Sequence, residues 1–140
     1  MRTSIKFFVL VASILLVFSG CKKYEDGPVF SLLTKKARLT GEWSLDSYSV
    51  NEADQTSIFL LLAGNNFKLK IAKDDKYSIV GNLAEEGTWK LTEDKNDIVF
   101  RPKNYGDPEK IYRILRLKNK ELWFKQTQST GNVVEYHFKQ

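Results

Sequence analysis

From Gly41 to the end of the chain, the sequence is a succession of short stretches in which apolar and polar residues alternate. The stretch Phe67–Ile71 is typical, because Phe67, Leu69 and Ile71 alternate with two lysines. A period of two places every second side chain on one face of a β-strand, which predicts strands with one buried face. Only short turns separate most of these stretches, so the strands lack crossover helices and successive strands are expected to pair antiparallel.

The alternation predicts about eight strands. A flat sheet of that length would expose two edges and tend to curl, whereas closure into a barrel removes both edges. We therefore expect an all-β fold, an eight-stranded antiparallel up-and-down β-barrel, with a two-sheet sandwich as the alternative. The apolar run Ile58–Ala63 fits a buried strand or a short helix over the barrel end, because its period does not distinguish them. The expected strands span residues 43–50, 67–71, 77–81, 87–91, 98–100, 111–117, 122–125 and 133–138.

The first 20 residues have the layout of a secretory signal. Arg2 and Lys6 precede the uncharged apolar segment 7–18, and small residues follow it. That segment is shorter than the roughly 20 residues that a transmembrane helix needs. Cys21, the only cysteine, directly follows Gly20, and a cysteine in this position resembles the lipobox of bacterial lipoproteins. The resemblance implies cleavage between Gly20 and Cys21 and attachment of acyl chains such as palmitate to the sulfur and the amine of Cys21.

These features divide the chain into a signal peptide (1–20), a lipid anchor and tether (21–29) and a barrel domain (30–140). Phe30, Leu33 and Ala37 have helical spacing, which predicts a short helix before the first strand. Lys22 follows the cysteine, where aspartate is the usual inner-membrane retention signal of lipoproteins. The resemblance therefore implies an outer-membrane anchor in the cell envelope, and it leaves open whether the domain faces the periplasm or the exterior.

The charge of the chain is too balanced to indicate a nucleic-acid partner. The full sequence has 22 basic and 17 acidic residues, and removal of residues 1–20 takes away two basic residues and no acidic one. Neither clustering of lysine and arginine nor basic–aromatic interleaving is present, which argues against nucleic-acid binding. With Cys21 acylated, no thiol remains for a disulfide, so the core alone must hold the fold.

The start of the first strand reads Gly41-Glu42-Trp43, and this G-x-W pattern before a meander resembles the lipocalin/calycin superfamily. The closer resemblance is to small lipocalin-like lipoproteins of Gram-negative bacteria. It rests on an ordered set of motifs that spans residues 39–138: L-T-G-E-W at 39–43, G-T-W-K-L at 87–91, the strand 111–117 and E-L-W at 121–123.

The lipocalin resemblance gives Trp43 a structural role, packed across the closed end of the barrel under an arginine from the last strand. No arginine follows Arg116 in this chain, so Arg113, Arg116 or Lys139 would have to replace it. Independently of the resemblance, a tryptophan at a strand start buries a large apolar area, and Gly41 permits a close backbone approach.

Bulky residues at alternate positions would point into the barrel. They could line a pocket for a small molecule, or they could fill the interior completely, and the sequence leaves both options open. The candidate ligand-binding residues are Phe67, Leu69, Tyr77, Ile79, Phe100, Phe124 and Tyr136.

The sequence gives little support for catalysis. His137 is the only histidine, which excludes a two-histidine metal site, and no nucleophile accompanies the Glu135–His137 pair on the last strand. The acidic pairs 74–75 and 85–86 are expected to be solvated turn residues rather than calcium ligands. We therefore expect no enzyme, no catalytic residues, no metal and no cofactor.

The sequence thus predicts a lipid-anchored, lipocalin-like protein that binds a small, largely apolar molecule at the cell envelope. The alternative is a non-enzymatic accessory or inhibitory lipoprotein with a filled barrel, which binds an envelope protein. That alternative predicts an exposed aromatic patch, for which Tyr48, Tyr105 and Tyr112 are candidates.

Overall fold

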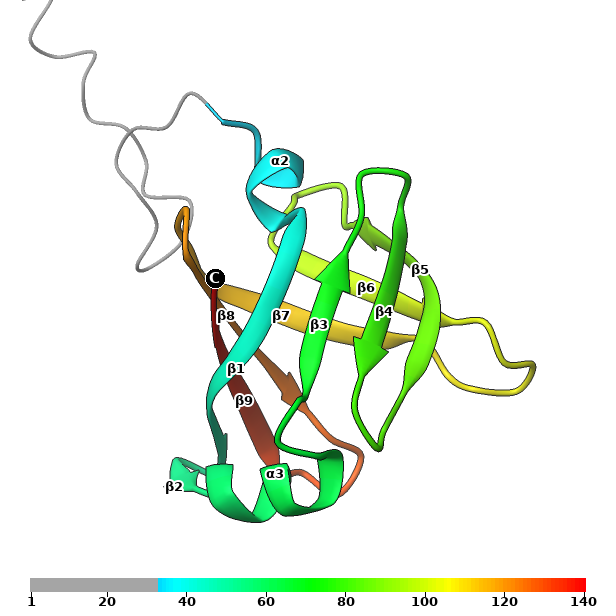
Figure 1. Cartoon of the computed structure of the whole chain (residues 1–140). Coiled ribbons are helices and arrows are strands. Elements are labelled where there is room, and N and C mark those ends of the chain that lie inside the picture. Colours follow the sequence, from blue (N-terminus) through cyan, green and yellow to red (C-terminus); the bar gives the residue numbers. More distant parts are fainter. Residues whose placement is uncertain (1–32) are drawn as a thin grey trace, which may run out of the picture.

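The computed structural model describes residues 33–140; the expected signal peptide, Gly20, Cys21 and the tether lie outside them. Within the described part, nine antiparallel strands form one sheet in the order β2-β1-β3-β4-β5-β6-β7-β8-β9. An additional pairing between β1 and β9 closes the eight longer strands into a barrel (Figure 1), as predicted. The strands are β1 (Gly41–Val50), β2 (Ala53–Asp54), β3 (Lys68–Ile71), β4 (Lys76–Val80), β5 (Glu85–Leu91), β6 (Asp97–Pro102), β7 (Lys110–Leu117), β8 (Glu121–Thr127) and β9 (Val133–Lys139).

The longest strand, β1, closes the barrel because it pairs with a different strand on each side. Its first residues, Gly41–Ser44, pair with β3, and its register with β9 runs from Ser44 to Val50. The register with β9 shifts between Leu45 and Ser47, which is a β-bulge. A bulge bends a strand and increases its twist, which helps β1 to follow the curve of the barrel wall.

The helix α2 (Lys35–Leu39) packs at the end of the barrel where β1 begins (Figure 1). Thr34 caps it, since the Thr34 hydroxyl accepts a hydrogen bond from the Ala37 amide at 3.1 Å. Arg38 donates to the Leu117 carbonyl oxygen at the end of β7, at 2.8 Å. The structure therefore confirms a short helix before β1, and the part of the expected helix before residue 33 lies outside the described residues.

Trp43 is completely buried at this packed end of the barrel. Its indole Nε1 donates a hydrogen bond to the Leu39 carbonyl oxygen at 2.8 Å, so the last residue of α2 pairs the polar atom of the tryptophan. Arg116, one of the cations considered for Trp43, lies instead over the Trp123 ring at 3.8 Å.

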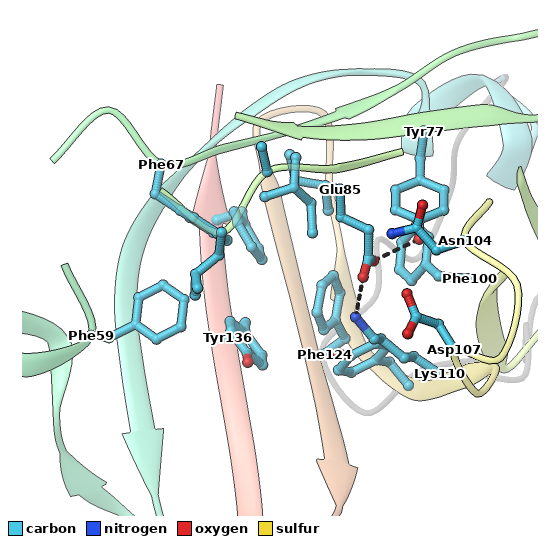
Figure 2. A pocket seen from close by; sticks show the side chains of 16 residues that line it. Phe59, Phe67, Tyr77, Glu85, Phe100, Asn104, Asp107, Lys110, Phe124 and Tyr136 are labelled. Atoms are coloured by element: carbon cyan, nitrogen blue, oxygen red, sulfur yellow. Dashed lines mark hydrogen bonds and ion pairs between the residues drawn. The ribbon is translucent and has the colours of Figure 1, made fainter. Parts of the chain in front are cut away.

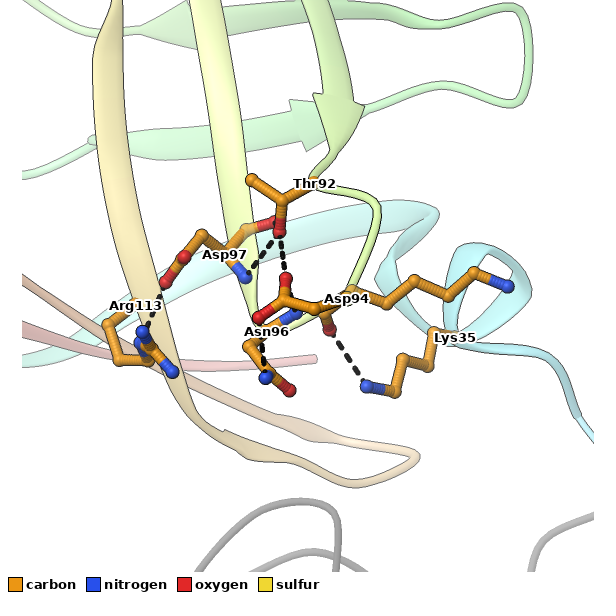
Figure 3. Close-up of polar contacts among 7 residues, drawn as sticks. Lys35, Thr92, Asp94, Asn96, Asp97 and Arg113 are labelled. Atoms are coloured by element: carbon orange, nitrogen blue, oxygen red, sulfur yellow. Dashed lines mark hydrogen bonds and ion pairs between the residues drawn. The ribbon is translucent and has the colours of Figure 1, made fainter.

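The turn between β5 and β6 joins α2 to the barrel through a local network of hydrogen bonds (Figure 3). The Thr92 hydroxyl donates to Asp94 at 2.6 Å and accepts from the Asp97 amide at 3.1 Å. Lys35 of α2 donates to the Lys95 carbonyl oxygen at 2.8 Å. These contacts pair several polar groups of the turn and link it to α2, while the buried Asn96 Oδ1 accepts no hydrogen bond.

The helix α3 (Thr56–Ala63) lies at the opposite end of the barrel, between β2 and β3 (Figure 1). The apolar run 58–63 therefore belongs to a helix and not to a strand. The helix ends at Gly64, whose φ of 93° is a conformation that favours glycine. The Ala63 carbonyl oxygen accepts from the Asn82 amide at 2.7 Å, which ties the end of α3 to the loop after β4.

Candidate ligand-binding site

The interior of the barrel contains a cavity of about 440 Å³ that lies toward the α3 end. That volume falls within the range of about 300–1,000 Å³ that is typical of small-molecule sites. The cavity wall includes all seven candidate ligand-binding residues: Phe67, Leu69, Tyr77, Ile79, Phe100, Phe124 and Tyr136. The remaining lining residues are Phe59, Leu83, Ala84, Glu85, Asn104, Asp107, Lys110, Tyr112 and Phe138. The bulky side chains of the strands therefore do not fill the barrel completely.

One side of the cavity is an aromatic cluster into which α3 inserts a single ring. Phe59 of α3 lies 4.6 Å from Tyr48, 4.9 Å from Phe67 and 5.8 Å from Tyr136, measured between ring centroids. Tilted and edge-to-face contacts of this kind add to the free energy gained from burying the rings. Phe59 therefore both anchors α3 to the barrel and forms part of the cavity wall.

The other side of the cavity carries a half-buried charged group. Glu85, at the start of β5, accepts a hydrogen bond from the Tyr77 hydroxyl at 2.7 Å and forms an ion pair with Lys110 at 2.5 Å. The Glu85 side chain is only 15% exposed, and that of Lys110 is 35% exposed. Figure 2 shows these side chains on the opposite side of the cavity from Phe59 and Phe67.

The tyrosines in and beside the cavity are neutral at physiological pH. Burial raises the pKa of Tyr77, and the hydrogen bond to Glu85 and the nearby carboxylate charges raise it further. Burial also raises the pKa of Tyr112 to about 12, with a contribution from the charge of Glu85. The pKa of Tyr136 is raised mainly by burial as well. The tyrosines therefore act as hydrogen-bonding groups and not as anions.

The expectation that Glu85 is a solvated turn residue is wrong. Glu85 pairs with Ile79 in the register of β4 and β5, and both side chains line the cavity. The strand begins two residues earlier than the motif G-T-W-K-L indicated, which places Glu85 on the same face as Gly87 and Trp89. Extending the alternation upstream from Trp89 would have found this residue.

Two further lining residues were missed for different reasons. Lys110 has the same parity on β7 as Tyr112 and Ile114, which face inward, but it was missed because Tyr112 was expected on an exposed patch. Phe59 could not be found in this way, because the period of residues 58–63 did not decide between strand and helix.

The outer wall carries a second group of aromatic and charged side chains. Trp123 of β8 packs between Arg116 of β7, at 3.8 Å, and His137 of β9, whose ring lies 4.1 Å away. His137 Nε2 contacts a Glu135 carboxylate oxygen at 2.5 Å, as their shared face predicted. Neighbouring strands supply this row, which is the arrangement expected of a cross-strand ladder that stabilises the wall.

Exposed apolar residues lie on α3 and in the β4–β5 loop. Leu61 and Leu62 of α3 are 80% and 65% exposed, and Leu83 of the β4–β5 loop, which lines the cavity, is 53% exposed. Of the tyrosines expected on an exposed patch, only Tyr105 is fully exposed, whereas Tyr48 and Tyr112 join the inward aromatic contacts. The three tyrosines therefore do not form one exposed patch, and three of the large exposed apolar residues, Ile58, Leu61 and Leu62, lie on α3 instead.

A comparison with known protein families found no match to this chain, and a search of curated proteins found no significant match. Within residues 33–140, no group of three or more His, Cys, Asp or Glu residues is arranged to hold a metal ion. None of the helices in that part has both the length and the apolar character that a membrane crossing requires.

Proposed function

We propose that this chain is a lipid-anchored, lipocalin-like protein that binds a small, largely apolar molecule at the bacterial cell envelope, without catalysis. The observation that carries the proposal is the cavity of about 440 Å³ inside a closed eight-stranded barrel. Its wall is mainly aromatic and aliphatic, with a few polar groups on one side, which is the usual composition of a small-molecule site. The free energy of binding would come mainly from burial of apolar ligand surface.

Native mass spectrometry of the protein purified from its own cell envelope tests whether it carries a bound small molecule. The proposal predicts a separable extra mass beyond the protein and its acyl chains. The purified protein should also bind the neutral apolar fluorophore N-phenyl-1-naphthylamine with one site per chain. Absence of both the extra mass and the probe binding would refute ligand binding.

The lipid anchor is supported by the sequence around Cys21 alone and needs a separate test. Replacement of Cys21 by serine should abolish incorporation of a palmitate analogue and move the protein from the outer-membrane fraction to the soluble fraction. Unchanged labelling and fractionation of Cys21→Ser would contradict acylation at this residue.

A second candidate function is binding of an envelope protein partner, and the exposed apolar residues beside the cavity favour it. Leu61, Leu62 and Leu83 are all more than half exposed, and Leu83 also lines the cavity. Leu62 and Leu83 lie on connected segments, because the Asn82 side chain donates to the Leu62 carbonyl oxygen at 3.2 Å. Cross-linking in intact cells should then identify one partner that is lost when Leu61 and Leu62 are changed to serine.

A further inference from the structure

The cavity is divided into an apolar part and a polar part, and this division bears on the chemistry of the ligand. Figure 2 shows the rings of Phe59, Phe67 and Tyr136 on one side, and Glu85 and Lys110 on the other. Asn104 and Asp107 of the β6–β7 loop lie on the same side as Glu85. A ligand that fills both parts has an apolar body and a polar head, and the head would lie at the Glu85 side.

The ionisable groups that line the cavity carry a net negative charge. They are two carboxylates, Glu85 and Asp107, and one ammonium group, Lys110. Lys110 forms its ion pair with Glu85 at 2.5 Å, so the charge of Lys110 is already offset. The charge of Asp107 then remains, so a carboxylate head at this place would be repelled by Asp107, while a cationic head would be attracted.

Aromatic rings beside the carboxylates favour a cationic head further. The ring of Phe100 lies 4.7 Å from Tyr77 and 5.9 Å from Tyr112, measured between centroids, and all three rings line the cavity. Aromatic rings attract cations electrostatically, most strongly where water is partly excluded. The rings and the residual carboxylate charge therefore act in the same direction.

We infer that the ligand of this cavity is an amphipathic cation, an apolar chain or ring system with an amine head held between Asp107, Glu85 and the surrounding rings. The inference rests on the proposed ligand-binding function and makes it more specific. Fatty acids and other apolar anions are the class that the same cavity disfavours.

The test compares three ligands that differ only in the head group. Decylamine, decan-1-ol and decanoate are cationic, neutral and anionic at pH 7.5, and each is used below its micelle concentration to displace N-phenyl-1-naphthylamine. The protein is the Cys21→Ser variant of the full chain, so that acyl chains do not bind the probe. We expect decylamine to bind about fivefold tighter than decan-1-ol, and decanoate about fivefold weaker, since one unit charge at a partly exposed site contributes roughly 1 kcal/mol. Raising the salt concentration should reduce both ratios.

The variant Asp107→Asn locates the effect in the cavity. The affinities of decylamine and decan-1-ol are compared within this variant, and the preference for decylamine should fall toward one. The matched control is Asp74→Asn, which removes the same charge at the packed end of the barrel and should leave the preference unchanged. Asp74 lies in the turn before β4, where it pairs with Lys76 at 2.8 Å.

The outcomes separate this inference from the proposed function. If the fluorophore does not bind, the proposed function fails and the inference fails with it. If the fluorophore binds but decanoate displaces it as well as decylamine does, the cavity is a binding site and the cationic ligand is refuted. A preference for decylamine that persists in Asp107→Asn would refute the assignment of Asp107.

Discussion

The two ends of the barrel are closed in different ways. At the packed end, Trp43 and Leu39 have no exposed surface, and α2 is joined to the strands by backbone and side-chain hydrogen bonds. At the other end, α3 contributes Phe59 to the interior and leaves Leu61 80% exposed. The cavity lies at this second end. Of the polar residues that line it, Glu85 and Lys110 are partly buried, and Asn104 and Asp107 are exposed.

This difference indicates how a small chain can hold a cavity without losing its fold. A cavity forfeits packing contacts, and each residue that lines it contributes less to stability than a fully packed one. The packed end supplies the compensating burial, because Trp43 and Trp89 both lie there with paired indole N–H groups.

The largest expected effect is at Trp43. Replacement by alanine should lower the free energy of unfolding by about 3–5 kcal/mol, because it leaves a cavity in the packed end. Trp43→Phe keeps a ring but leaves the Leu39 carbonyl oxygen without its donor, and should cost about 1–3 kcal/mol. Urea denaturation measures both. Trp123→Ala is the control, since Trp123 lies on the outer wall, and a loss as large as that of Trp43→Ala would remove the distinction between the two sites.

The substitution Phe59→Ala should destabilise the fold less than Trp43→Ala does, but it should weaken ligand binding. Phe59→Ala removes the only ring of α3 that contacts Phe67 and Tyr136, and should cost about 2 kcal/mol, less than a fully buried phenylalanine. Amide hydrogen exchange should become faster in α3 but not in α2. Affinity for N-phenyl-1-naphthylamine should fall about tenfold, which corresponds to about 1.4 kcal/mol of lost contact. Equal acceleration of exchange in both helices would contradict the independence of the two ends.

The open end should also be the part that responds to alkaline pH. The pKa of Tyr112 is raised to about 12, and those of Tyr77 and Tyr136 are raised as well, so the folded chain keeps protons that the unfolded chain loses. The stability is therefore fully present below a pH of about 10, the pKa of an unfolded tyrosine, and decreases as the pH rises above it.

Urea midpoints measured from pH 8 to 12 test this dependence. The Tyr136→Phe variant lacks one of the titrating hydroxyls and should lose less stability over the same interval than the wild type. A midpoint that is constant up to pH 12 in the wild type would show that these hydroxyls are not buried in solution.

The smallest effect is expected on the exposed side of α3. Leu61→Ser should change the free energy of unfolding by less than about 0.5 kcal/mol, because the side chain is already in contact with solvent. Leu60→Ser is the matched variant on the same helix. Leu60 packs against the core and should be clearly more sensitive. Chemical denaturation measures the stability of both variants. If Leu61→Ser were less stable than Leu60→Ser, the orientation of α3 described above would be wrong.

The alternation of residues was sufficient to predict the closed barrel, since strands such as Phe67–Ile71 have a strict period of two. The same alternation predicted seven inward side chains, and all seven line the cavity. It missed Glu85, since an acidic pair near a turn is usually solvated. The alternation extended upstream from Trp89 would have placed this carboxylate inside, and the pairing with Ile79 shows it there. Whether a cavity remains depends on side-chain packing across the whole barrel, which no local pattern contains.

The most direct test of the account is a crystal structure of the protein with 10-bromodecan-1-ol, whose bromine atom gives an anomalous signal. The account predicts one bromine peak inside the barrel, within van der Waals contact of Phe67 or Phe124, with the hydroxyl toward Glu85. A barrel whose side chains meet in the centre, with no bromine peak among the lining residues, would contradict the central claim that the α3 end holds a ligand-binding cavity.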